Sequence, residues 1–148
     1  MKILVATDGT KHGEAAIEIL RRFTMSAADE VKIVSVVDMA VPLAIDVYGG
    51  YLPDTTELEK AARSNAAQIL ETAVAAAKII AGKDGPAVSG DVLFGSPESR
   101  IVETAEQMPA DLIIVGSHGY NRWERLLLGS VSDSVVHHAP CSVLVVRS

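Results

Sequence analysis

Short apolar runs alternate with longer segments of helical periodicity along the whole sequence, and this alternation is what most constrains the fold. Five runs have the character of strands: Met1–Ala6, Val31–Val37, Val88–Phe94, Asp111–Val115 and Ser142–Val146. Their nearly continuous apolar character is typical of strands buried on both faces. Strands that alternate with helices form a parallel sheet covered on both faces, with right-handed crossovers. The sequence therefore predicts one doubly wound α/β domain over residues 1–148.

Four segments between the predicted strands have the spacing of helices. Apolar residues recur every three or four positions in 13–23, and the last helix is expected at 130–138. Ser96-Pro97-Glu98 supplies an N-cap, a helix-start proline and an early acid for a third helix. The longest helix ends near Gly82. Its predicted apolar stripe consists of Leu58, Ala62, Ala66, Ile69, Ala73, Ala76 and Ile80.

Composition narrows the class of protein. With 49% hydrophobic and 22% charged residues, the chain supports a packed interior. The formal net charge of −6 disfavours nucleic acid as a partner, because phosphate backbones need a basic face. The longest apolar runs are too short to cross a bilayer, and the lone Cys141 excludes a disulfide within the chain. We expect a cytoplasmic protein without a membrane partner, in which any anionic ligand is held by local groups.

The turns after the first and fourth strands are the places to search for chemistry. In sheets of this kind, ligands sit at the carboxyl ends of strands where the strand order reverses. The fourth strand is followed by GSHG (116–119) and then by Gly129-Ser130, a spacing of G-x2-G-x9-G-S. The first two glycines would let the backbone approach a ligand, and Ser130 with Asp133 predicts an N-cap with a capping-box partner. Free N–H groups at such a helix start suit a phosphate tail.

The pattern of these motifs is similar to that of a known family. Neither G-x4-G-K-S/T nor G-x-G-x2-G occurs in the chain. The complete strand pattern together with the segment GSHGYNRWERLLLGSVS resembles the universal stress protein family, in its ATP-binding subgroup. The resemblance covers essentially the whole chain. It implies an adenine-nucleotide alpha-hydrolase-like fold, with five parallel strands in the order 3-2-1-4-5 and helices on both faces.

The resemblance also assigns roles to residues. Asp8 matches the family's acidic residue beside the nucleotide, and Val36 matches the residue whose backbone meets adenine. Ala6 stands where some ATP-binding members have proline, a departure that alters the rigidity of the turn more than its chemistry. No catalytic residue is assigned, and Mg²⁺ or Mn²⁺ is expected with ATP through unassigned ligands. The full set of expected ATP-binding residues is Ala6, Thr7, Asp8, Val36, Gly116, Ser117, His118, Gly119, Arg122, Gly129, Ser130, Val131 and Ser132.

Several residues allow a structural role as well as a functional one. Asp8 either forms a turn or a helix cap, or contacts nucleotide or metal. His118 is either a spacer in the loop or a hydrogen-bond donor to the ligand. Arg122 and Arg125 are either ordinary exposed charges or groups that steer an anion. The apolar cluster around Trp123 either packs its loop on the domain or covers the ligand, and packing is the preferred interpretation.

We assign no chemical role to three further features of the sequence. Residues 38–53 form a long segment that we expect to be a flexible edge of the site. His137 and His138 are adjacent in a helix and point in different directions, so they do not suit one metal ion. Cys141 is expected to act as a small buried apolar residue.

The function implied by the resemblance is a regulatory ATP-binding module whose nucleotide state is recognised by a stress-response partner. A slow Mg²⁺-dependent ATPase or phosphotransferase is the first alternative, and a nucleotide-free dimeric interaction protein is the second. Strand 142–147 lies at an edge in the implied order and carries no lysine, proline or bulge before Arg147. We therefore expect a homodimer paired through this strand, and the alternative is that residues 38–53 cover it within one chain.

Overall fold

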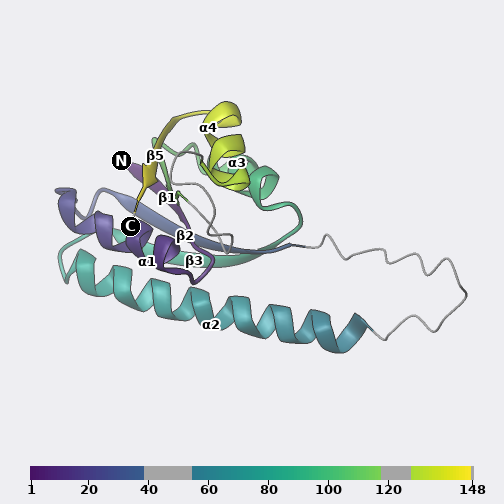
Figure 1. The fold of residues 1–148 in the computed structure, drawn as a ribbon. Coiled ribbons are helices and arrows are strands. Elements are labelled where there is room, and N and C mark those ends of the chain that lie inside the picture. The colour runs from purple at the N-terminus through teal and green to yellow at the C-terminus, as the bar shows by residue number, and fades with distance from the viewer. Residues whose placement is uncertain (39–54, 118–127, 148) are drawn as a thin grey trace, which may run out of the picture.

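A five-stranded parallel sheet forms the centre of the computed structural model, which describes residues 1–38, 55–117 and 128–147 (Figure 1). The strands pair in the order β3-β2-β1-β4-β5, and every pairing is parallel. Both the predicted α/β class and the predicted strand order are confirmed. The strands are β1 (Lys2–Ala6), β2 (Glu30–Val37), β3 (Ala87–Phe94), β4 (Leu112–Gly116) and β5 (Ser142–Val146).

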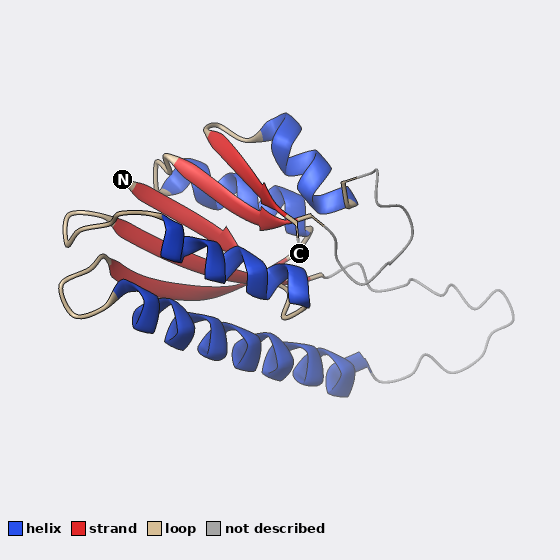
Figure 2. Ribbon diagram, turned by 60° about the vertical axis from the view of Figure 1, so that its left-hand side comes forward, coloured by secondary structure: helices blue, strands red, loops and turns tan. Residues whose placement is uncertain are grey.

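Helices cover the two faces of the sheet in pairs (Figures 1 and 2). One layer consists of α1 (Lys11–Glu18), its 3₁₀ continuation η1 (Ile19–Arg22) and α2 (Thr55–Ala81). The opposite layer consists of α3 (Pro97–Gln107) and α4 (Ser130–His138). Among the described residues, none of these helices is long and apolar enough to span a bilayer.

The central strand β1 supplies residues to two apolar cores. Ile3, Leu4 and Val5 are completely buried. Because successive side chains of a strand point to opposite faces, Ile3 and Val5 join the core beneath α1 and α2, while Leu4 joins the core beneath α3 and α4. An apolar run without alternation therefore suits a strand whose two faces are both covered.

The first helix begins earlier than its periodicity predicts. The Thr10 side chain accepts a hydrogen bond from Gly13 N at 3.4 Å, so the helix starts at Lys11 rather than at residue 13. Its predicted last turn is a 3₁₀ turn over Ile19–Arg22. Apolar spacing did not locate the start because the capping side chain and the first helical residues are polar.

The long helix is longer than the sheet that it covers. Its 27 residues extend for about 40 Å at the rise of an α-helix, whereas the eight-residue strand β2 spans about 26 Å. Ala66 and Ala73 of the predicted stripe are buried, as expected. The predicted long helix is confirmed, but Ala62, which is exposed, and Leu58, which is 68% exposed, do not join the core. The end of α2 that carries these two residues extends past the sheet in Figure 1.

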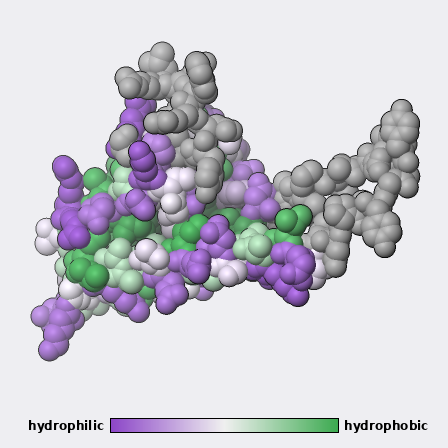
Figure 3. Space-filling model, turned by 60° about the horizontal axis from the view of Figure 1, so that its bottom comes forward, coloured by the Kyte–Doolittle hydropathy of each residue, from purple (hydrophilic) through white to green (hydrophobic). Residues whose placement is uncertain are grey.

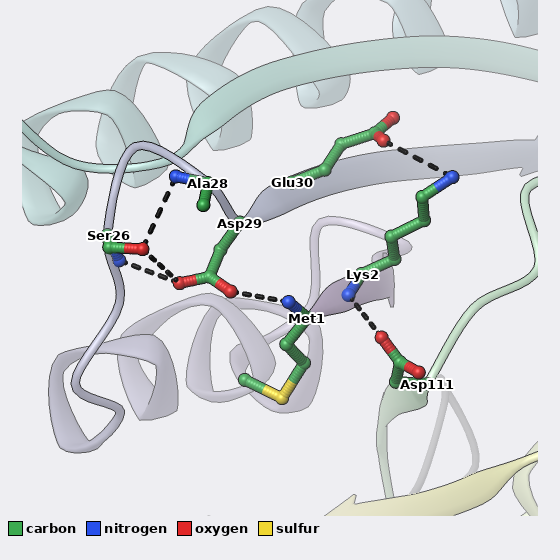
Figure 4. A network of polar contacts seen from close by, with 7 residues as sticks. All are labelled: Met1, Lys2, Ser26, Ala28, Asp29, Glu30 and Asp111. Carbon is green, nitrogen blue, oxygen red and sulfur yellow. Dashed lines mark hydrogen bonds and ion pairs between the residues drawn. The ribbon is translucent and has the colours of Figure 1, made fainter.

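A polar network joins the starts of three strands (Figure 4). The Met1 amino group forms an ion pair with Asp29, whose carboxylate also accepts bonds from Ser26 N at 2.7 Å and Ser26 Oγ at 3.0 Å. These hydrogen bonds lower the pKa of Asp29 to about 2, the bond from the amino terminus having the largest effect. Beside it, Lys2 N donates to Asp111 Oδ2 at 2.6 Å. The network lies at the end of the sheet opposite the carboxyl ends of the strands.

The turn after β1 depends on a glycine in a left-handed conformation. Gly9 has a φ of +74°, and a Cβ atom built on it would lie 2.8 Å from Cγ1 of Ile69 in α2. Gly82, just after α2, has a similar φ of +72° but faces open space, with nothing within 4 Å of its built Cβ. A substitution at Gly82 therefore measures the cost of the backbone conformation alone, whereas one at Gly9 adds the cost of steric overlap with Ile69.

We predict that Gly9→Ala destabilises the protein more than Gly82→Ala. Both variants place alanine in the left-handed region, at a cost of about 1–2 kcal/mol. Only Gly9→Ala also forces Ile69 to move, which adds about 1–3 kcal/mol. Urea unfolding followed by circular dichroism measures the difference, and equal losses for the two variants would show that α2 does not press on this turn.

The Asp29 network predicts a specific dependence on pH. Because folding lowers the pKa of Asp29 from 3.8 to about 2, its stabilising contribution is complete above the ordinary value and is lost as the pH falls toward 2. Asp29→Asn should therefore be less stable than wild type at pH 5, and the difference should shrink as the pH falls below 4 and be mostly lost by pH 2. The control is Asp84→Asn, which changes an exposed aspartate. A stability difference for Asp29→Asn that persists unchanged at pH 2 would contradict this assignment.

Candidate functional site

The site predicted from sequence lies at the carboxyl ends of β1 and β4, on either side of the point where the strand order reverses. β1 pairs with β2 on one side and with β4 on the other, so the chain leaves β1 in one direction and later returns to its other side. Thr7 N donates to Val34 O at 3.0 Å, and Ser117 N donates to Val146 O at 2.8 Å. These bonds extend both ladders by one residue and fix Thr7 and Ser117, which are buried, at the same end of the sheet.

The turn after β1 holds Asp8 in place. Asp8 Oδ1 accepts hydrogen bonds from Thr10 N at 3.0 Å and from Thr10 Oγ1 at 2.6 Å. Thr10, rather than Asp8, is the N-cap of α1. Of the two structural roles expected for Asp8, the structure shows the turn and not the helix cap. The residue itself is exposed, and none of the described residues donates a hydrogen bond to its Oδ2.

Gly116 serves a packing role that the sequence did not suggest. A Cβ atom at this position would lie 2.7 Å from the carbonyl carbon and oxygen of His12. Backbone atoms cannot move aside as the end of a flexible side chain can. The missing side chain thus lets the start of α1 approach the end of β4. Sequence analysis gave another reason for glycine at position 116, the close approach of the backbone to a ligand, and this stays a prediction.

The start of α4 is tied directly to the end of β4. The carbonyl oxygen of Ser117 accepts a hydrogen bond from Gly129 N at 2.7 Å and another from Ser132 Oγ at 3.2 Å. Ser132 Oγ also lies 3.0 Å from the carbonyl oxygen of Gly129. Ser132 and Ser117 are both almost fully buried. These contacts bring together the two ends of the G-x2-G-x9-G-S motif.

The N-cap of α4 differs from the prediction. The N-cap is Gly129, with extended backbone angles, and no side chain of the described residues caps the helix. Ser130 is instead the first helical residue, and Asp133 donates its backbone N–H to Gly129 O at 2.9 Å while its side chain lies near His137. The capping-box prediction is wrong because the serine and the acid lie one position too far along the helix. The first N–H groups of α4 therefore have no intrahelical acceptor and no capping side chain from the described part of the chain.

Three apolar residues of the predicted set lie on the side of the sheet that carries α3 and α4. Ala6, Val36 and Val131 are partly buried, and all three pack against the same apolar core. They come from β1, β2 and the first turn of α4. The fold thus brings them into one region, next to the uncapped helix start.

Some of the predicted residues lie outside the described part of the chain. They are His118, Gly119 and Arg122, together with Arg125, Trp123 and most of the segment 38–53. Among the described residues, no group of three or more His, Cys, Asp or Glu side chains is arranged to hold a metal ion.

Comparisons with known proteins match the chain over nearly its full length. The model of the universal stress protein family matches residues 1–147. The chain belongs to the universal stress protein family. A Staphylococcus aureus (strain USA300) protein that carries this family name is 37% identical over 149 aligned residues, which cover 99% of this chain and 83% of that protein.

Two solved structures of universal stress proteins extend the comparison. UspA from Lactobacillus plantarum has a TM-score of 0.76 at 26% identity, and the alignment covers 99% of this chain and 97% of the other. A universal stress protein solved in complex with cAMP has a TM-score of 0.67 at 25% identity, with coverage of 99% and 96%. These matches confirm the family and the fold that the sequence resemblance implied.

Two basic residues at this end of the sheet are not part of the predicted site. Lys11 is the first residue of α1, directly after the Asp8 turn, and Arg147 follows β5 at the level of Ser117. Both residues are exposed. Only their position, one to three residues from a predicted strand end or turn, could have pointed to them in the sequence. The net charge of the chain does not distinguish them from other basic residues.

The contacts of four other titratable residues, Glu98, Cys141, His137 and His138, lie within the fold. A hydrogen bond with the Ser96 side chain lowers the pKa of the Glu98 carboxyl at the start of α3. Burial raises the pKa of the Cys141 thiol, which packs partly buried against the core of α3 and α4. His137 and His138 are exposed, and each ring lies 2.8 Å from the carbonyl oxygen four residues earlier. The interpretation of these two histidines as structural or solvated groups fits these contacts.

Proposed function

We propose that this universal stress protein is a regulatory module that binds ATP between the ends of β1 and β4 and the start of α4. The observation that carries the proposal is the uncapped start of α4 at Gly129, held beside β4 by the Ser117 carbonyl. Backbone N–H groups at a helix start satisfy phosphate oxygens, and the helix dipole favours their negative charge. Glycine as N-cap leaves these donors available to a ligand.

The apolar side of the site suits an adenine ring. Ala6, Val36 and Val131 provide partly buried apolar surface on the side where α4 begins. Ligand sites of this kind combine such surface with a few fixed polar groups. The family member that was solved with cAMP supports an adenine nucleotide as the ligand class.

A divalent cation completes the proposed site. The chain carries a net charge of −6, and Asp8 adds a carboxylate beside the proposed phosphates. Mg²⁺ is usually bound through one or two carboxylates and the phosphates of the substrate, so a site with one aspartate is sufficient. Asp8 Oδ2 is the oxygen that would contact the ion, because Oδ1 already accepts two hydrogen bonds from Thr10.

We expect Gly129→Asp to weaken ATP binding by about tenfold or more while the fold is retained. Aspartate is a favourable N-cap residue, and the extended angles of Gly129 accept a side chain. Its carboxylate would occupy the N–H groups and repel phosphate, at a loss of roughly 1.5–3 kcal/mol. Isothermal titration with ATP, ADP, AMP and cAMP measures the effect.

The control is Gly82→Asp, which adds the same side chain at the opposite end of the sheet; its left-handed backbone lowers stability, but the folded variant should bind ATP as wild type does. Repeating the titrations in excess Mg²⁺ and in EDTA tests the metal, since a Mg²⁺-bridged tail binds more tightly with the metal present. Timed conversion of bound ATP to ADP tests the ATPase alternative. Unchanged affinity in a folded Gly129→Asp variant would remove the phosphates from α4.

The edge strand β5 supports the proposed homodimer. Among the described residues β5 pairs only with β4, and Val143, Leu144 and Val145 are partly buried. Val146 O accepts a bond from Ser117 N on the β4 side. Because peptide groups alternate in direction along a strand, the N–H and C=O of Val145 face away from β4. An apolar edge with outward-facing backbone groups can pair with a second copy about a two-fold axis.

Val145→Pro should therefore convert a dimer into a folded monomer. Proline at this position removes an N–H that faces the edge and leaves the bonds to β4 intact. Light scattering gives the mass, and circular dichroism checks the fold. The comparison variant is Leu144→Pro, whose lost N–H faces β4, so it should destabilise the monomer itself. A monomeric wild type, or a dimer that survives Val145→Pro, would exclude pairing through β5.

A further inference from the structure

A groove of about 500 Å³ lies between α1 and α2, on the face of the sheet away from α3 and α4. Thr7 and Gly9 line its inner end, so it reaches the turn after β1 from the side of α2. Ala6, Val36 and Val131 of the proposed nucleotide site pack against the core beneath α3 and α4, across the sheet from this groove. The groove shares Thr7 with the expected nucleotide-binding residues, but the rest of its lining belongs to Gly9, α1 and α2.

The floor of the groove is apolar because small side chains of α2 face a large one of α1. Ile17 is 3% exposed and Ala73 is 7% exposed, and both belong to the core beneath α1 and α2. Ala76 and Ile69 continue the floor along α2. Alanines opposite Ile17 leave the space between the helices unfilled. Figure 3 looks onto the layer that contains α2, where apolar areas interrupt a polar surface.

The two rims of the groove differ in charge. Glu14 and Glu18 lie four residues apart on α1, one helical turn, and both line the groove. The α2 rim carries the uncharged groups Asn65, Gln68 and Thr72. Glu18 accepts a bond from Arg21 Nε at 2.6 Å, whereas Glu14 forms no ion pair with any described residue. No lysine or arginine is among the described residues that line the groove.

We propose that this groove binds a small amphipathic amine. The apolar body of the ligand lies on Ile17, Ala73 and Ala76, and its protonated nitrogen faces Glu14. Sites for small molecules commonly have volumes of about 300–1,000 Å³ and an apolar lining with a few polar groups. The volume therefore favours a small molecule, and this inference does not depend on the proposed nucleotide site.

Three probes of similar shape test the proposal: phenethylamine, 2-phenylethanol and phenylacetate. Titration of ¹⁵N-labelled protein, followed by amide chemical shifts, should show phenethylamine shifting residues 14–18 and 65–76. The neutral alcohol should bind more weakly, and the carboxylate should not bind. Glu14→Gln should weaken the amine by roughly threefold, the effect of one exposed ion pair, and should leave the alcohol unchanged.

Glu106→Gln is the matched control, because it removes the same charge from an exposed position on α3 in the opposite layer. It should leave the affinity for phenethylamine unchanged. Ala76→Phe should fill the floor and abolish binding of both amine and alcohol, with circular dichroism checking its fold. Should that variant not fold, Glu14→Gln alone decides the test.

Three results with these probes and variants would overturn the proposal. They are the absence of shifts at α1 and α2 with 20 mM phenethylamine, equal affinity for the amine and the alcohol, and equal loss in Glu14→Gln and Glu106→Gln. Binding of a basic helical peptide at these residues without binding of the amine would also overturn it, because it would identify the groove as a protein-docking surface.

Discussion

The burial of β1 between two strands and two helical layers is the constraint on which the rest of the structure depends. Its three central residues are completely buried, and they contribute to both apolar cores. A strand in this position must end with polar backbone groups that find partners, and Thr7 does so by bonding to Val34 O. The turn that follows is held to the sheet on one side and to α2 on the other. The position of Asp8 thus follows from the packing of the core.

The second half of the candidate site depends on one carbonyl group. Ser117 O accepts bonds from both the backbone and a side chain at the start of α4, although the two segments are separated by ten residues outside the described part of the chain. This contact fixes the start of a nine-residue helix beside the end of β4. The orientation of the uncapped N–H groups is therefore set by buried, well-packed residues, which is the kind of preorganisation that binding sites need.

The sequence was sufficient for the fold because its local patterns agree with one another. The strands β1 to β5 and the helix 130–138 follow from apolar runs, and the strand order follows from the family resemblance. Packing details were not predictable in the same way. Gly116 had the sequence signal of a ligand loop, yet its Cβ position is closed by the backbone of His12. The cap of α4 shifted by one residue, since Gly129 and Ser130 are both acceptable N-caps in sequence. The groove between α1 and α2 has no signal in sequence, because alanines on a helical stripe equally suit a closed core.

The contact between Gly9 and Ile69 links two positions that are sixty residues apart in the chain. Since Ile69 occupies the space that a side chain at position 9 would need, the two residues cannot vary independently. Alanine or asparagine at the turn would be accommodated best beside a smaller residue on the facing side of the long helix, or beside a helix displaced outward. The seating of α2 on the turn therefore limits which pairs of side chains these two positions can hold together.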